Sequence, residues 1–156
     1  MAAKANVPIG VEEPILRGDS REISLLVADE DISLTYAGRP ADERVTGPHT
    51  HQHAEAFYVL EGELTFAVGH ERETITLGPG GFVAVPPGVA HAFRTAGSHS
   101  ARWLVIHAPD GGFAVFMRGI RDGADVEWDI APVPSDGGLR ADHAIVSRAL
   151  SEPAAS

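Results

Sequence analysis

The sequence is dominated by short apolar runs, each bounded by glycine, proline or an acidic turn. The runs have the length of β-strands, and the 17 glycines and 11 prolines of the chain favour tight turns over long helices. They cover residues 22–27, 32–37, 55–60, 64–68, 74–77, 82–85, 91–95 and 102–107. Regularly spaced short strands of this kind predict an all-β fold, either a sandwich or a barrel.

The pattern changes after residue 110. Apolar residues then recur at the spacing of one helix face, at Phe113, Phe116, Met117 and Ile120. We expect a short helix here that packs on the β domain. Residues 123–138 are acidic and rich in proline and glycine, which is typical of a loop that wraps a domain.

The length of 156 residues allows one domain with a substantial core. We predict a β-barrel domain over residues 1–110 and a C-terminal extension over residues 111–156. Within the extension, residues 139–150 could form a second helix, and residues 151–156 have the character of a frayed tail.

The chain is strongly acidic, with 22 acidic residues against 12 basic ones and a formal net charge of -10. This charge repels phosphate backbones and anionic lipid, so neither nucleic acid nor a membrane is an expected partner. Residues 1–10 lack the apolar core of a signal peptide and no apolar run reaches transmembrane length, which predicts a cytoplasmic protein. The absence of cysteine restricts any metal site to nitrogen and oxygen ligands.

Histidines are concentrated in one segment, where His49, His51 and His53 alternate with other residues and Glu55 follows. A further histidine, His91, follows a Pro-Pro-Gly turn. Alternate side chains of a strand lie on one face, so His49 and His51 can reach the same cavity. Because imidazoles and a carboxylate are typical ligands of divalent transition metals, the sequence predicts a metal site.

The same residues carry a resemblance to the cupin superfamily. The first cupin motif runs from His-x-His through a glutamate to a glycine, and its spacing is met by His49, His51, Glu55 and Gly62. The second motif places a histidine after a Pro-x-Gly turn, and its spacing is met by Gly80, Pro86, Gly88 and His91. Two positions depart from the family pattern: Glu43 stands at the opening glycine and Thr95 at the closing asparagine.

The resemblance implies a double-stranded β-helix, or jelly-roll, barrel that holds one divalent transition metal. The implied ligands are His49, His51, Glu55 and His91, and this set suits Fe, Mn, Ni, Co or Zn. Three imidazoles and one carboxylate leave one or two coordination positions for water, oxygen or substrate, as in reactive metal sites. The superfamily spans oxygenases, isomerases, decarboxylases, storage proteins and sensors, so membership alone does not define a reaction.

The sequence gives less support for a role of the other histidines in the metal site. His53 could be a ligand, but we favour a place behind the ligands or at the rim, where it could still move a proton. His107 ends a strand and could face either the cavity or the surface. His70 and His99 fall in turns and are expected to be solvated, and no pattern supports a role for His143.

Strand alternation also predicts a substrate pocket. Residues that share a face with Glu55 or His91 should point inward with them, namely Phe57, Val59, Phe93 and Thr95. Phenylalanine walls beside a metal suit a small, partly aromatic ligand. The outer face of the 55–60 strand carries Tyr58 and Leu60, and an apolar outer face predicts a cover. Either a second subunit or the 113–120 helix could provide it, and we favour a homodimer.

Three functional hypotheses follow. The first is a mononuclear metal-dependent oxygenase acting on a small enolic or phenolic compound, as the resemblance to quercetin-dioxygenase-like cupins implies, with Glu55 as general base. The second is a redox-neutral isomerase or cyclase, in which a Lewis-acidic ion polarises a carbonyl and His53 or Glu55 moves a proton. The third is a small-molecule-binding protein without catalytic activity.

Overall fold

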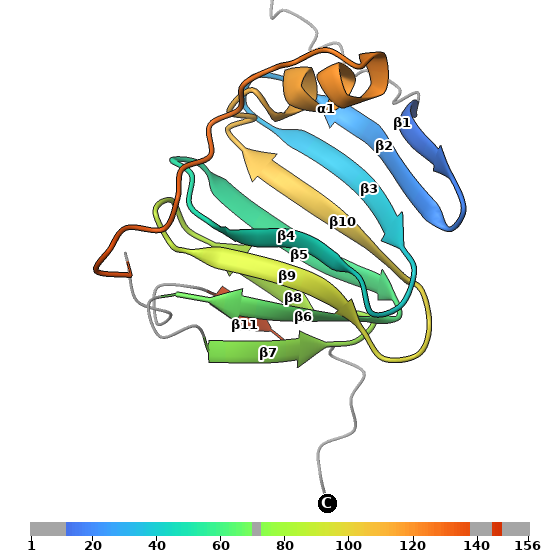
Figure 1. Cartoon of the computed structure of the whole chain (residues 1–156), viewed down its shortest axis with the longest axis vertical. Coiled ribbons are helices and arrows are strands. Elements are labelled where there is room, and N and C mark those ends of the chain that lie inside the picture. Colours follow the sequence, from blue (N-terminus) through green and yellow to red (C-terminus); the bar gives the residue numbers. More distant parts are fainter. Residues whose placement is uncertain (1–11, 70–72, 138–144, 148–156) are drawn as a thin grey trace, which may run out of the picture.

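The computed structural model describes residues 12–69, 73–137 and 145–147 (Figure 1). Predictions for residues 1–11, for residues 148–156 and for His70 and His143 lie outside these ranges. The elements are β1 (Glu13–Gly18), β2 (Arg21–Ala28), β3 (Ser33–Arg39), β4 (Arg44–His49), β5 (Ala54–Glu61), β6 (Glu63–Val68), β7 (Glu73–Leu77), β8 (Phe82–Val85), β9 (His91–Ala96), β10 (Ala101–Ala108), α1 (Phe113–Asp122) and β11 (Ile145–Ser147).

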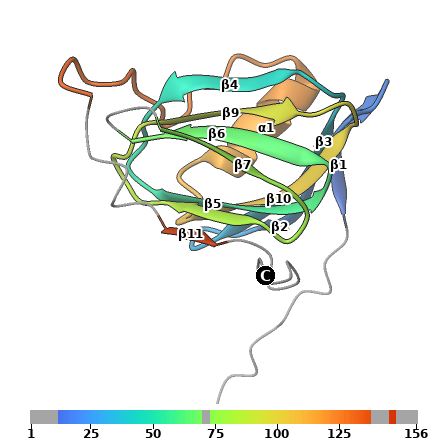
Figure 2. The ribbon, with the colours of Figure 1, turned by 90° about the horizontal axis from the view of Figure 1, so that it is seen from below.

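The described strands form two antiparallel sheets that face one another, as Figure 2 shows. The larger sheet has the order β1-β2-β3-β10-β5-β8-β11, and the smaller one has the order β4-β9-β6-β7. Each of the eight runs predicted from the sequence is a strand in the structure, extended in most cases by one or two residues. The all-β prediction is therefore confirmed.

The core between the sheets is built around aromatic residues. Phe57 and Phe66 lie 5.0 Å apart between ring centroids, and the ring of Phe93 lies 4.9 Å from that of Phe57. Trp103 meets Phe93 edge-on at 5.6 Å. All four are buried, and burial of large apolar side chains is the main stabilising term for a domain of this size.

The predicted helix is present as α1, between left-handed glycines at positions 112 and 123. Phe113 and Met117 are buried against Ile15, Ile23 and Leu25 of β1 and β2. The helix is thus packed on the β domain as expected, although Ile120 remains 48% exposed. Within the described ranges, no helix is both long and apolar enough to cross a membrane.

Three strands were not anticipated, and one of them corrects a prediction. Ile145–Ser147 forms β11 and pairs with β8, so the second helix predicted over residues 139–150 is wrong at these positions. The edge of β8 offers unpaired backbone groups, which a segment containing β-branched residues can satisfy. The rest of that prediction lies outside the described residues. β4 was missed because Gly47 and Pro48 lie within it, and both are disfavoured in strands.

Candidate metal centre

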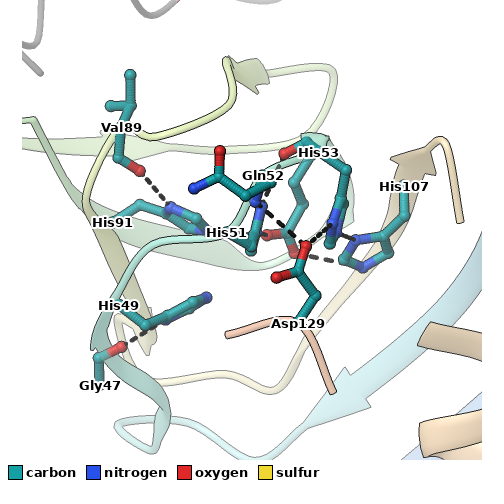
Figure 3. Close-up of polar contacts among 10 residues, drawn as sticks. Gly47, His49, His51, Gln52, His53, Val89, His91, His107 and Asp129 are labelled. Carbon is teal, nitrogen blue, oxygen red and sulfur yellow. Dashed lines mark hydrogen bonds and ion pairs between the residues drawn. The ribbon is translucent and has the colours of Figure 1, made fainter. Parts of the chain in front are cut away.

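The four predicted ligands come together in the structure, and Figure 3 shows how His49, His51 and His91 lie close to one another. His49 ends β4 and is paired in register with His91, which begins β9. His51 follows β4, and Glu55 is the second residue of β5. One ligand atom from each residue lies within 4.8 Å of the others, so the set could hold a single ion.

Backbone carbonyls orient the three imidazoles. Nδ1 of His49 lies 2.8 Å from the Gly47 carbonyl oxygen, and Nδ1 of His91 lies 2.9 Å from that of Val89. His51 Nδ1 contacts the carbonyl oxygen of His53 at 2.8 Å. Because a carbonyl can only accept, each Nδ1 donates a hydrogen bond to its carbonyl, which leaves Nε2 as the atom that each ring directs toward the site. This arrangement is typical of metal-binding histidines.

Glu55 lies where these nitrogens converge. Its Oε2 is 2.7 Å from His51 Nε2 and 2.8 Å from His91 Nε2. Lone pairs facing one another at this distance repel unless a cation, either a proton or a metal ion, lies among them. The residues present therefore fit a divalent transition metal in both donor type and orientation.

The charge state of Glu55 supports this fit. Burial acts to raise its pKa, but the hydrogen bonds to His51 and His91 outweigh burial and hold the pKa well below its ordinary value. For His91, burial acts to lower the pKa, and the Glu55 carboxylate more than compensates and raises it. The carboxylate is thus ionised at neutral pH, as a metal ligand must be.

His53 and His107 form a second layer behind His51. His53 Nε2 lies 2.8 Å from His107 Nδ1, and His107 Nε2 lies 3.6 Å from Glu55 Oε1. Burial lowers the pKa of His107 to about 4, so this ring is neutral at pH 7. The sequence left the orientation of His107 open, and the structure places it fully buried on the site side. A second possible ligand group is formed by His51, His53 and His107. His99, by contrast, is exposed in its turn, as expected.

Residues 123–137 lie against this layer and contain neither a helix nor a named strand. Ala131 exchanges two backbone hydrogen bonds with Thr50, at 2.8 and 2.9 Å. The Trp128 ring lies 5.7 Å from that of His53, and Asp129 Oδ2 lies 3.6 Å from His53 Nδ1. Sequence reasoning missed Trp128 and Asp129. The only available signal was an isolated tryptophan in an otherwise polar loop.

A cavity of about 520 Å³ opens beside the four ligands. His49 and Glu55 form one end of it, and its walls come from both sheets, from α1 and from the wrapping loop. Most of the lining is apolar, including Phe93, Trp103, Val105, Phe113, Phe116, Met117 and Trp128. A largely apolar cavity next to a polar cluster is the usual form of a small-molecule site.

Only one of the four predicted pocket residues lines this cavity. Phe93 does so, whereas Phe57 and Val59 are buried in the core and form no part of its wall. Thr95 is also fully buried, and its hydroxyl bonds to the chain near Pro40 and Glu43. Inward-facing residues of two packed sheets mostly fill the core, so alternation alone could not distinguish pocket from packing.

Comparison with known proteins agrees with this geometry. A family model described as the cupin domain matches residues 39–107, the segment that carries all four candidate ligands. The chain belongs to the cupin superfamily. Quercetin 2,3-dioxygenase of Bacillus subtilis (strain 168) is 32% identical to this cupin over 118 residues, which are 72% of the chain and 33% of that enzyme. This cupin thus spans about a third of the length of the curated relative it matches.

Solved structures show the same fold. A cupin family protein with a double-stranded β-helix fold from Methanocaldococcus jannaschii superposes with a TM-score of 0.54 at 22% identity, covering 64% of this cupin and 89% of that chain. The polyketide cyclase RemF from Streptomyces resistomycificus superposes with a TM-score of 0.51 at 24% identity, covering 69% and 80%. These similarities confirm the predicted double-stranded β-helix.

Proposed function

We propose that this cupin is a mononuclear metal-dependent oxygenase that acts on a small enolic or phenolic compound. The observation that carries the proposal is the convergence of three carbonyl-anchored imidazoles on Glu55 at one end of an apolar cavity. A ligand held in that cavity would lie directly against His49 and Glu55. The 32% identity to quercetin 2,3-dioxygenase supports the oxygenase reading over other cupin activities.

In this proposal His49, His51, Glu55 and His91 hold one divalent transition metal, drawn from Fe, Mn, Ni, Co or Zn. When bound, the metal would supply Lewis acidity toward an enol or phenol oxygen and redox chemistry toward dioxygen. Glu55 lines the cavity, so we assign it the role of general base toward the hydroxyl proton of a bound phenol.

His53 does not line the cavity, which argues for an indirect role. It contacts His107, and His107 in turn lies 3.6 Å from Glu55 Oε1. We therefore assign His53 and His107 to the orientation of Glu55 and His51 rather than to direct contact with substrate. The catalytic role predicted for His53 from the sequence is reduced accordingly to that of a positioning residue.

Oxygen consumption tests the proposal. The full chain would be loaded separately with Fe, Mn, Ni and Co and assayed with flavonols and other enolisable phenols. We expect metal-dependent oxygen uptake by the wild type and loss of it in Glu55→Gln. The absence of oxygen uptake with every compound tested, at full metal loading, would contradict the proposal. Turnover by the zinc-loaded protein without oxygen would indicate a redox-neutral isomerase or cyclase instead, and ligand-induced thermal stabilisation without turnover would indicate a binding protein.

We also propose a homodimer that covers the outer face of β5. Tyr58 and Leu60 are 42% and 36% exposed there, and α1 lies against β1 and β2 and so does not cover them. Light scattering gives the molar mass directly. A dimer that dissociates in Leu60→Lys would support this interface, and a monomeric wild type at high protein concentration would rule it out.

A further inference from the structure

The end of the cavity remote from the metal centre carries a cation. The strand register places Ser33 of β3 opposite His107, which is opposite Glu55 on β5. Arg39 lies six residues further along β3, which is about 20 Å of strand. Thr35 and Ala37 line the cavity between these two levels, and Arg39 lines its far end. The cavity is therefore elongated, with Glu55 and Arg39 toward opposite ends.

Arg39 retains capacity to bind a ligand. Its side chain is 15% exposed, and its Nη1 donates to the Gly38 carbonyl oxygen at 2.9 Å. Glu43 Oε1 lies 3.6 Å from Nε, but the same carboxylate binds Arg21 at 2.6 Å. Two guanidinium groups thus share one carboxylate, which leaves excess positive charge at this end. With five N–H donors, Arg39 can make further hydrogen bonds.

Independent of Arg39, the cavity wall holds polar groups without partners. Trp103 is 1% exposed and Thr35 is 2% exposed, and both line the cavity. Neither Trp103 Nε1 nor Thr35 Oγ1 has a hydrogen-bond partner, and the same is true of Thr46 Oγ1 and Trp128 Nε1 on the wall. Leaving such groups unpaired is costly, and indole N–H can only donate. The four atoms are covered by protein, so the cation of Arg39 is what distinguishes this end of the cavity.

We propose that the cavity binds an elongated aromatic molecule that bears an acidic group at the end remote from the metal centre, where Arg39 receives it. This inference rests on the proposed function, since it names the substrate class of the same site. The polarity of the cavity sets the orientation of the molecule. Arg39 attracts the acidic group at one end, and the enol or phenol oxygen of the substrate is then directed toward His49 and Glu55 at the other. The neutral aromatic body lies along the apolar wall between them.

Binding of a matched pair of probes tests this inference without requiring turnover. The pair is biphenyl-4-carboxylate and the neutral biphenyl-4-carboxamide, titrated by calorimetry against the full chain, both metal-loaded and chelator-treated. The chain contains two tryptophans, and both line the cavity, so quenching of their fluorescence reports occupancy of this site. We expect the carboxylate to bind at least about tenfold more tightly than the carboxamide.

Variants assign this preference to its cause. Arg39→Met should abolish the preference for the carboxylate. The affinity of this variant for the carboxamide should be unchanged, which would show that the cavity is intact. Arg39→Lys should retain part of the preference. Arg102→Met is the matched control, because Arg102 lies beside Trp103 on the same sheet but pairs with Glu22 outside the cavity.

Three outcomes would overturn the inference. A preference that survives Arg39→Met and disappears with the chelator would place the carboxylate on the metal. Equal affinity for both probes, or no binding of either, would show that Arg39 does not select an acid. Because oxygen uptake is not the readout, failure of the oxygenase proposal leaves these results interpretable.

Discussion

Glu43 and Thr95 are hydrogen-bonded to each other across 52 residues of sequence. The Glu43 backbone N–H donates to Thr95 Oγ1 at 2.8 Å, and the Thr95 N–H donates to the Glu43 carbonyl oxygen at 2.9 Å. The Thr95 hydroxyl also donates to the Pro40 carbonyl oxygen at 2.7 Å. These are the two positions at which the sequence departs from the cupin motifs. The departures are thus partners in one contact, which holds the chain between β3 and β4 against β9.

This contact predicts a stability effect. Thr95→Val keeps the shape of the side chain but leaves the Glu43 N–H and the Pro40 carbonyl unpaired, which should cost about 1–3 kcal/mol. Thr95→Ser retains the hydroxyl and should cost less. Urea unfolding measures both, with Thr65→Val as the control because the Thr65 hydroxyl bonds to Thr76 at an exposed site. Equal stability of Thr95→Val and the wild type would show that these hydrogen bonds contribute nothing.

Metal content should depend on the four ligands and not on histidines elsewhere. His49→Ala and His91→Ala each remove an Nε2 donor from the group, so both should lose most of the metal. His99→Ala is the matched control, because His99 is exposed and lies outside both possible ligand groups. Elemental analysis of the folded proteins gives the ratio of metal to chain, and similar ratios in all three variants would refute the ligand assignment.

The layer formed by His53 and His107 should tune the metal rather than bind a second one. We expect one metal per chain in both the wild type and His107→Phe, with affinity reduced about 10- to 100-fold in the variant. The physical reason is that the His107 ring lies beside Glu55, with Nε2 3.6 Å from Oε1, and phenylalanine offers no polar atom there. Competition with a chromogenic chelator measures affinity and stoichiometry together. Two metals per chain, falling to one in His107→Phe, would instead identify a second ion among His51, His53 and His107.

The attachment of α1 should weaken in acid. A hydrogen bond from Arg118 holds the pKa of Glu13 below its ordinary value. A lowered folded-state pKa contributes stability above the ordinary glutamate pKa, and this contribution disappears as the pH falls through the folded-state value. Both side chains are partly exposed, so Glu13→Gln should cost at most about 1 kcal/mol at pH 7.

A double-mutant cycle isolates this effect. Glu13→Gln and Arg118→Met should each destabilise the protein at pH 7, and their combination should cost no more than the larger single effect. The difference between wild type and Glu13→Gln should shrink as the pH is lowered toward 4 in thermal unfolding. If the difference in stability between the wild type and Glu13→Gln does not change with pH, the ion pair between Glu13 and Arg118 does not contribute to the attachment of α1.

The sequence by itself determined the local features of this protein. Alternation of apolar residues between glycine and proline turns located eight strands, because the side-chain period of a strand is encoded within a few residues. The spacing of His49, His51, Glu55 and His91 likewise identified a candidate metal site, since the motif residues lie within two short segments. Helix α1 was found for the same reason, from the repeat of apolar residues along one face.

The tertiary structure decided whatever depends on contacts between distant segments. β4 is a strand despite Gly47 and Pro48 because it pairs with β9, and β11 is a strand because it meets the edge of β8. His107, Trp128 and Arg39 entered the site or its cavity through pairing and loop closure over many residues. Which inward-facing side chains line a cavity and which fill the core depends on how two sheets pack, and that packing is a property of the assembled fold.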